Sequence, residues 1–277
     1  MVTSSNRLRL LYNTTPVEEF DKLLGRFADR DLENLTRSTL PLLSYWRNPE
    51  RAASAVLAGV FGSHDSHQVP CGALSFEFQV PSFPRITGQP NTPSHTDVMY
   101  LSDDIAVAIE AKWSESVSAC VAEWLGDGSE NKRAVLDHWV RLIRNHTGCG
   151  AIAEGKLAKL VYQVLHRTAS LCSCASGKSR CAVVYQLFGD GSSTKKYEEA
   201  LQSMACCVGA GLSRSPLSLW VHEVSMNSSL GYGEVAKLVA DVPIDRRPAL
   251  IKKAILNGSL FLFPSERFIR IDAPKAS

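Results

Sequence analysis

Two short apolar runs separated by Ser102-Asp103-Asp104 limit the possible folds of this chain more than any other feature. They fall within residues 95–113 and are rich in β-branched and aromatic side chains, which favour β-strands. The polar residues between them favour a tight turn, so the stretch predicts a β-hairpin. A loop formed by Asp103 and Asp104 alone would place Asp97 directly opposite Glu110. Lys112 would share the face of Glu110, because alternate side chains of a strand point to the same side.

The two faces of the predicted hairpin differ in chemistry. Two carboxylates in opposed positions lie about 5 Å apart at Cβ and repel each other. A hard divalent cation such as Mg²⁺ relieves that repulsion, and a neighbouring lysine can orient or help deprotonate a water molecule on the cation. The alternative is a surface hairpin with a cross-strand ion pair between lysine and a carboxylate. The opposite face is predicted to enter the core and consists of Val98, Tyr100, Ile105, Val107 and Ile109.

An Asp on one strand followed by Glu-x-Lys at the end of the next strand resembles the signature of the PD-(D/E)XK nuclease superfamily. Here the motif reads Thr96-Asp97 and Glu110-Ala111-Lys112, with threonine where proline is usual. The resemblance implies that Asp97 and Glu110 hold Mg²⁺, for which Mn²⁺ can substitute, with the Ala111 carbonyl as a further ligand. It also implies that Lys112 orients and activates the attacking water, that the substrate is DNA, and that the protein is a candidate homodimer.

Further residues are candidates for the same site. Glu77, on a strand predicted at 72–80, is either an accessory metal ligand or a solvent-facing strand residue. His95 is either a contact to the scissile phosphate or a polar strand end. Gln163 and Arg167 fall outside the apolar stripe of a helix predicted at 152–172. The resemblance implies a phosphate-binding role for such residues on the core helix, whereas a polar helix stripe is otherwise a solvated face.

The remaining pattern predicts an α/β protein of mixed α+β character. Helices are expected at 15–46 (as a pair), 51–61, 115–126, 129–146, 152–172, 194–209 and within 232–257, and strands at 72–80 (with Leu74, Phe76 and Phe78 on one face), 180–188, 217–224 and within 258–271. This order matches the restriction endonuclease-like αβββαβ core, a central mixed sheet flanked by helices. One nuclease-like domain is expected over 1–277, with N-terminal helices at 1–62, a catalytic core at 72–225 that carries a helical insertion at 115–150, and C-terminal helices and a tail at 226–277.

Charge and hydropathy exclude some function classes. A formal net charge of +2 does not suggest a strongly cationic, nonspecific nucleic-acid binder, although it leaves room for a local basic groove. The sequence has no apolar run long enough for a transmembrane helix and no signal-peptide pattern at its start. We therefore expect a cytoplasmic protein without a membrane partner.

Three interpretations of function follow from the sequence. The first is a Mg²⁺-dependent DNA endonuclease of the restriction or repair type. The second is a catalytically inactive nuclease-like module that binds DNA or a protein partner. The third is a metalloprotein in which Cys172, Cys174 and Cys181, with Cys149, ligate zinc or an iron–sulfur cluster. Because the Cys-x-Cys spacing does not match a zinc knuckle, buried reduced thiols are the simpler interpretation of the eight cysteines.

Overall fold

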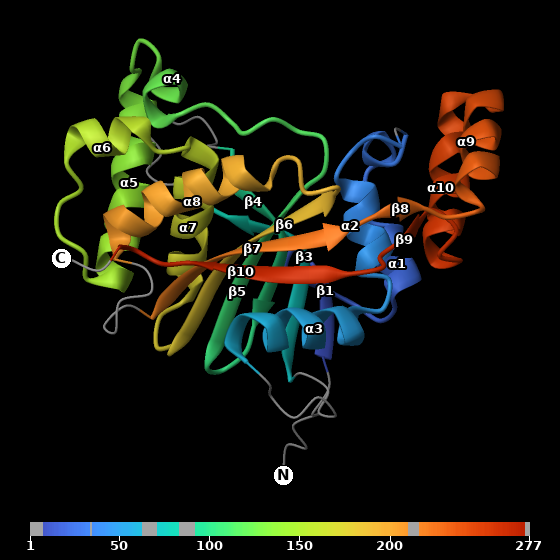
Figure 1. The fold of residues 1–277 in the computed structure, drawn as a ribbon, viewed down its shortest axis with the longest axis horizontal. Helices are drawn as coiled ribbons and strands as arrows, with labels where there is room; N and C mark the ends of the chain where they lie inside the picture. Colours follow the sequence, from blue (N-terminus) through green and yellow to red (C-terminus); the bar gives the residue numbers. More distant parts are fainter. Residues whose placement is uncertain (1–7, 34, 63–70, 83–91, 210–215, 275–277) are drawn as a thin grey trace.

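A single eight-stranded mixed sheet lies at the centre of the molecule (Figure 1). The computed structural model describes residues 8–33, 35–62, 71–82, 92–209 and 216–274. Along the sheet the strands follow the order β10-β7-β6-β5-β4-β3-β1-β2. Strands β3, β4 and β5 form an antiparallel meander, whereas β5, β6 and β7 are parallel. The sheet strands are β1 (Leu8–Tyr12), β2 (Thr15–Val17), β3 (Gly72–Val80), β4 (Ser94–Leu101), β5 (Ile105–Lys112), β6 (Arg180–Gly189), β7 (Leu217–Ser225) and β10 (Glu266–Ile271).

Helices cover both faces of this sheet, which confirms the predicted mixed α/β class. One apolar cluster lies between the sheet and α5, α7 and α8 and contains Trp139 and Tyr197. The other lies between the opposite face and α1, α2, α3 and α10 and contains Trp46 and Phe76. The α-helices of the described residues are α1 (Phe20–Leu24), α2 (Thr39–Tyr45), α3 (Pro49–Phe61), α4 (Val121–Leu125), α5 (Glu130–Thr147), α6 (Glu154–Lys159), α7 (Tyr162–Cys174), α8 (Thr194–Val208), α9 (Tyr232–Asp241) and α10 (Arg247–Leu256).

The predicted hairpin and its register are confirmed in β4 and β5. Val98 pairs with Ile109 and Leu101 with Ala106, and Ser102 N donates to Ile105 O at 2.9 Å, so the loop is the one expected. The expectation that only one face is apolar is wrong. Ala106 belongs to the apolar cluster beneath α7, because helices cover this face as well.

The N-terminal region differs from the expected pair of helices. It begins with a strand, β1, which pairs in parallel with β3, and continues into β2 at the edge of the sheet. Pro16 lies in β2, where an edge strand tolerates a residue without an N–H. The helices that follow are short, and Pro41 lies in the first turn of α2. Helix α3 forms as predicted, because Asn48 Oδ1 accepts from Arg51 N at 3.2 Å and Pro49 occupies the first turn.

The helix predicted at 152–172 is split into α6 and α7. Leu160 and Val161 are extended between them, because Leu160 O accepts from Val121 N at 2.8 Å and Tyr162 N donates to Ala119 O at 3.0 Å. These contacts also confine the helix expected at 115–126 to α4. The break changes which residues of α7 face the sheet, so that Arg167 is buried instead of lying on a solvated face.

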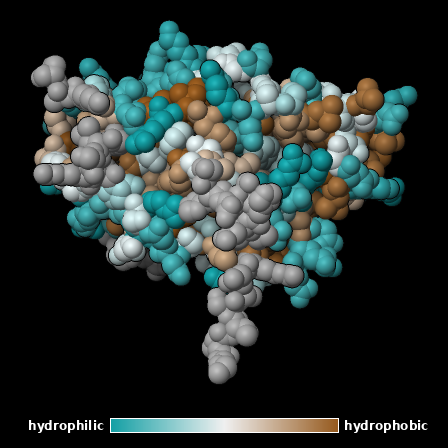
Figure 2. Space-filling model, turned by 60° about the horizontal axis from the view of Figure 1, so that its bottom comes forward, coloured by the Kyte–Doolittle hydropathy of each residue, from teal (hydrophilic) through white to brown (hydrophobic). Residues whose placement is uncertain are grey.

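The C-terminal part adds an edge strand and a helical pair. Strand β10 pairs antiparallel with β7, while β9 (Phe261–Leu262) pairs with β8 (Asn227–Ser228) outside the main sheet. Helices α9 and α10 lie at one end of the molecule, and Figure 2 shows apolar side chains at the same end. The large apolar residues exposed there are Leu230, Leu238, Ile244, Leu256 and Leu262. Among the described residues, no helix has the length and apolar character that crossing a membrane requires.

Candidate active site

The site begins where β4 and β5 stop pairing. Their hydrogen-bonded ladder ends at Val98 and Ile109, and the same register places Asp97 opposite Glu110. Beyond this point β4 continues to pair with β3 as far as Ser94, and β5 continues to pair with β6 as far as Lys112. The two strands therefore separate at the acidic pair, which leaves their facing backbone groups free for other partners.

Ala111 occupies the gap between the separated strands. Its N–H donates to Asp97 Oδ2 at 2.7 Å, so this backbone edge faces Asp97 rather than a paired strand. The N–H and C=O of one strand residue point toward the same edge. The Ala111 carbonyl therefore faces the side on which Asp97 lies, where the resemblance had placed a third ligand.

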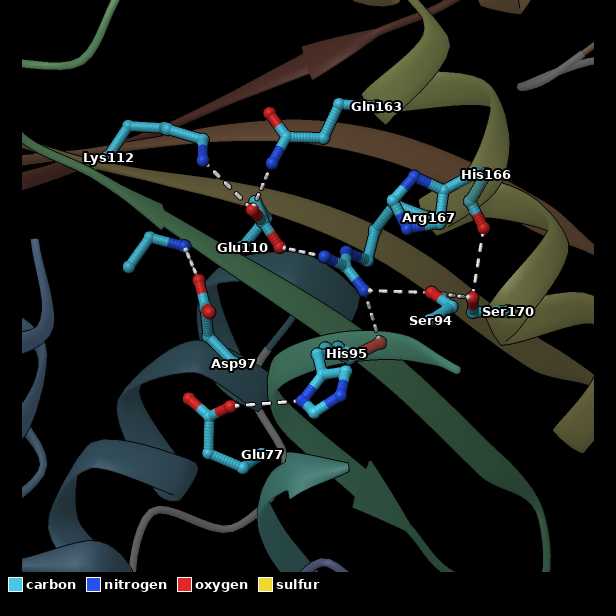
Figure 3. A network of polar contacts seen from close by, with 12 residues as sticks. Glu77, Ser94, His95, Asp97, Glu110, Lys112, Gln163, His166, Arg167 and Ser170 are labelled. Atoms are coloured by element: carbon cyan, nitrogen blue, oxygen red, sulfur yellow. Dashed lines mark hydrogen bonds and ion pairs between the residues drawn. The ribbon is translucent and has the colours of Figure 1, made fainter. Parts of the chain in front are cut away.

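Glu110 is the most heavily contacted side chain of the site. It is buried, and its Oε1 accepts from Lys112 Nζ at 2.9 Å and from Gln163 Nε2 at 2.6 Å. Its Oε2 lies 2.5 Å from Arg167 Nη2. Thus α7 supplies an amide and a guanidinium to one carboxylate of β5, as Figure 3 shows. The structure brings Gln163 and Arg167 to the site, where both contact Glu110.

Two residues that the sequence did not assign to the site hold Arg167 in place. Arg167 Nη1 donates to Thr96 Oγ1 at 2.8 Å and to Ser94 Oγ at 3.4 Å. Ser94 Oγ lies 2.8 Å from Ser170 Oγ, which ties the start of β4 to α7. Thr96 stands where the nuclease signature usually has proline, and a proline would offer no hydroxyl to Arg167. That departure was the one signal in the sequence that could have pointed to this contact.

Glu77 lies on the other side of Asp97 in an irregular part of β3. Phe76 pairs with Val98 and Phe78 with Thr96, so the same register sets Glu77 opposite Asp97. Glu77 has φ 52°, an uncommon conformation for a residue with a side chain. The strand reverses its faces here, because Phe76 packs in the cluster under α2 and Phe78 in the cluster under α7. The expectation that Leu74, Phe76 and Phe78 share one face is therefore wrong.

His95 lies beside Glu77 at the rim of the site. Its Nδ1 is 3.4 Å from Glu77 Oε2, and its side chain is 43% exposed. Figure 3 shows the imidazole and the Glu77 carboxylate together at one side of the polar network. Exposure leaves His95 accessible to a bound molecule, whereas Arg167 is enclosed by protein.

Burial and mutual repulsion govern the protonation of the acidic groups. Burial, followed by the charge of Glu110, raises the pKa of Asp97 to about 8, although Lys112 and Arg167 oppose the shift. Burial also raises the pKa of Glu77, against the hydrogen bond to His95. Burial acts to lower the pKa of Lys112, but the carboxylates of Glu110 and Asp97 outweigh it and raise that pKa. The lysine is therefore cationic at neutral pH. The Asp97 carboxyl group is mostly protonated there, and a bound cation would displace its proton.

The donor set fits a hard divalent cation. Asp97 and Glu110 offer carboxylate oxygens and Ala111 a carbonyl, which are the ligand types that Mg²⁺ and Mn²⁺ prefer. Burial, and after it the charge of Glu110, disfavours the ionised form of Asp97, and a bound cation would favour that form. In the described part of the chain, no group of three or more His, Cys, Asp or Glu side chains is arranged to hold a metal. This finding gives no support to a cysteine-ligated centre, and it means that a cation between Asp97 and Glu110 would need backbone or water oxygens.

The cysteines behave as isolated thiols. All eight are free, and Cys172 and Cys181 are buried. Burial raises the pKa of Cys181 to about 11, so its thiol stays protonated at neutral pH. A buried protonated thiol packs as a small apolar side chain.

Comparison with known proteins adds a family but no activity. No curated protein and no solved structure matches the chain. Residues 16–235 match a family model described as "Domain of unknown function (DUF6946)". The matched segment runs from β2 into α9 and contains the acidic pair, Lys112 and all of α7. Because the model covers most of its length, the chain belongs to the DUF6946 family.

Proposed function

We propose that this chain is a divalent-metal-dependent nuclease with a restriction endonuclease-like core, and that it hydrolyses phosphodiester bonds of DNA. One observation carries the proposal: β4 and β5 separate where Asp97 faces Glu110, with Lys112 on the same strand face and the Ala111 backbone turned toward Asp97. The order α3, β3, β4, β5, α7, β6 supports it, since it follows the αβββαβ arrangement. The insertion between β5 and α7 is formed by α4, α5 and α6.

Each residue has a role in this proposal. Asp97, Glu110 and the Ala111 carbonyl would hold the cation, and Glu77, which the strand register sets opposite Asp97, is the candidate accessory residue. A bound Mg²⁺ would supply Lewis-acid polarisation of the phosphate and would lower the pKa of a nearby water. Lys112, cationic beside Glu110, would orient the attacking water and offset negative charge on the phosphate.

Two side chains of α7, the Gln163 amide and the Arg167 guanidinium, restrain the Glu110 carboxylate. Gln163 and Lys112 share Oε1, and Arg167 takes Oε2, so the carboxylate cannot rotate freely. Arg167 positions Glu110 and is too enclosed to reach a phosphate. Gln163 and His95 are less buried and are the groups that we assign to the phosphate backbone.

A plasmid-cleavage assay tests the proposal. Supercoiled plasmid is incubated with the protein and Mg²⁺ or Mn²⁺, and the products are compared with an EDTA control. We expect metal-dependent cleavage that falls at least about 100-fold in Lys112→Gln and in Asp97→Asn. Asp97→Asn keeps an oxygen that can accept from Ala111 N, so it tests charge rather than folding. Lys22→Ala, an exposed lysine on α1, is the matched control and should cleave like the wild type. Undiminished cleavage in both site variants would refute the assignment.

A binding module without catalysis is the second candidate. The observation in its favour is that both oxygens of the Glu110 carboxylate already contact protein groups, those of Lys112, Gln163 and Arg167. In that case the plasmid would stay intact with either metal, and Asp97→Asn would leave DNA binding unchanged. A gel-shift titration with the same plasmid fragment, in EDTA and in Mg²⁺, separates this candidate from the nuclease.

A further inference from the structure

A cavity lies on the face of the sheet opposite α7. It has a volume of about 450 Å³ and opens between the α2–α3 junction and the segment that joins β9 to β10. Its walls include Phe261 and Phe263 on one side and Arg47 and Arg51 on the other. The candidate active site lies on the α7 side, so this cavity is a separate feature of the molecule.

A chain of hydrogen bonds determines the protonation state of Glu266, which lines the cavity. Trp46 Nε1 donates to Gln186 Oε1 at 3.0 Å, which turns the Gln186 amide toward His222 Nδ1 at 3.2 Å. Since Nδ1 accepts, the neutral imidazole carries its proton on Nε2 and donates to Glu266 Oε2 at 2.9 Å. Tyr45 OH donates to the same oxygen at 2.6 Å.

Glu266 is therefore an ionised acceptor with one oxygen to spare. The hydrogen bond from His222, aided by Tyr45 and the charge of Arg51, lowers the pKa of Glu266. Its Oε1 has no hydrogen bond from the described residues. A ligand that places an amine or amide N–H near this oxygen would complete its coordination.

Two arginines line the same cavity as Glu266. Arg47 and Arg51 are exposed and have no ion pair among the described residues. Arg51 is close enough to Glu266 to lower its pKa, but two guanidinium groups exceed one carboxylate in charge. Guanidinium groups bind phosphate through paired N–H donors, and aromatic side chains stack on planar rings.

We propose that this cavity binds a small organic phosphate with a planar, N–H-bearing ring, of the class of nucleoside monophosphates. Arg47 and Arg51 hold the phosphate, Phe261 and Phe263 contact the ring, and Glu266 accepts from a ring amine. The inference does not depend on nuclease activity, because none of these residues belongs to the site on α7.

Isothermal titration calorimetry with adenosine 5′-monophosphate in EDTA tests the proposal, with adenosine and inorganic phosphate as further probes. We expect saturable binding of the nucleotide, at least tenfold tighter than that of either part alone. Arg51→Gln and Arg47→Gln should each weaken it at least tenfold, because each removes a charge-assisted hydrogen bond. The matched control is Arg144→Gln, an exposed arginine on α5, which should bind like the wild type.

One further variant separates this cavity from the candidate active site. Lys112→Gln should leave binding unchanged. Absence of nucleotide binding by the wild type, equal affinity for inorganic phosphate, or loss of binding in Lys112→Gln with retention in Arg51→Gln would each overturn the proposal. Failure of plasmid cleavage would not affect it.

Discussion

At the scale of a single residue, Asp97 links the stability of the fold to the candidate active site. Its carboxylate accepts from the Ala111 backbone and faces Glu110, while burial and that neighbouring charge raise its pKa to about 8. The folded chain therefore binds this proton more tightly than the unfolded chain does. The stabilisation from that proton is complete below about pH 4 and is lost as the pH rises through about 8.

Asp97→Asn removes this pH dependence. In EDTA, we expect the variant and the wild type to melt within about one degree of each other at pH 4, and the variant to melt at least about 6 °C higher at pH 9. The reason is that asparagine stays neutral next to Glu110 and can still accept from Ala111 N. Thermal unfolding followed by circular dichroism at several pH values provides the measurement. Asp103→Asn, in the exposed turn, controls for the loss of one charge, and a constant offset between wild type and Asp97→Asn from pH 5 to 9 would contradict the argument.

At the scale of a strand, β3 shows how a local irregularity positions an acid. The left-handed backbone at Glu77 exchanges the faces of β3, so that Phe76 and Phe78 enter different apolar clusters. Asn13 supports the bend, because its N–H donates to Phe76 O at 2.7 Å and its Oδ1 accepts from Gln79 N at 3.1 Å. The bend leaves Glu77 next to Asp97 and His95 rather than in a regular ladder.

Substitutions at Glu77 should report this backbone strain. We expect Glu77→Gly to leave the free energy of unfolding unchanged or raise it by up to about 1 kcal/mol, because glycine adopts positive φ without steric cost. Glu77→Val should lower it by more than about 1 kcal/mol, since a β-branched side chain is disfavoured there. Urea denaturation measures the difference, and Glu77→Gln separates the loss of charge from the change in backbone preference. Equal stability of the glycine and valine variants would show that the bend stores no strain.

The elements that the sequence predicts correctly are those specified by nearby residues. The hairpin register follows from the turn at Asp103 and the alternation on either side of it, and both are local. Strand β1 is not predictable in this way, because its partner β3 follows only after the whole α1–α3 segment. Neither is the break at Val161, which depends on contacts with residues 119–121. The candidate site follows the same rule: the motif predicts Asp97, Glu110 and Lys112, but only the packing of α7 brings Arg167 onto Glu110.

At the scale of the whole molecule, β5, which carries Glu110 and Lys112, is an interior strand of the sheet and is covered on both faces. It pairs with β4 and β6 along its edges, and its alternate side chains enter the two apolar clusters on opposite faces. Lys112 and Glu110 thus stand at the end of a strand that cannot open without disrupting both cores. The edge strands β2 and β10 have one neighbour each and are less constrained.

Hydrogen exchange should reveal this gradient. We expect amides of Ala106–Ile109 to exchange only on global unfolding, and those of Glu266–Ile271 to exchange at least about tenfold faster through local opening. Peptide-level exchange followed by mass spectrometry, at two pH values to confirm the exchange regime, gives the comparison. Protection of β10 equal to that of β5 would contradict the picture of a sheet whose stability falls from its centre to its edges.

The enclosure of Glu110 by Lys112, Gln163 and Arg167 has a consequence for the order in which the polypeptide folds and binds an ion. A zinc finger gains its shape and its ion in one event, because its ligands have no other partners. Here the chain supplies its own counter-charges, so we expect it to fold without an ion. If the chain is the proposed nuclease, folding and the binding of the divalent ion are then separate steps, and the folded protein stays inactive until the ion is supplied.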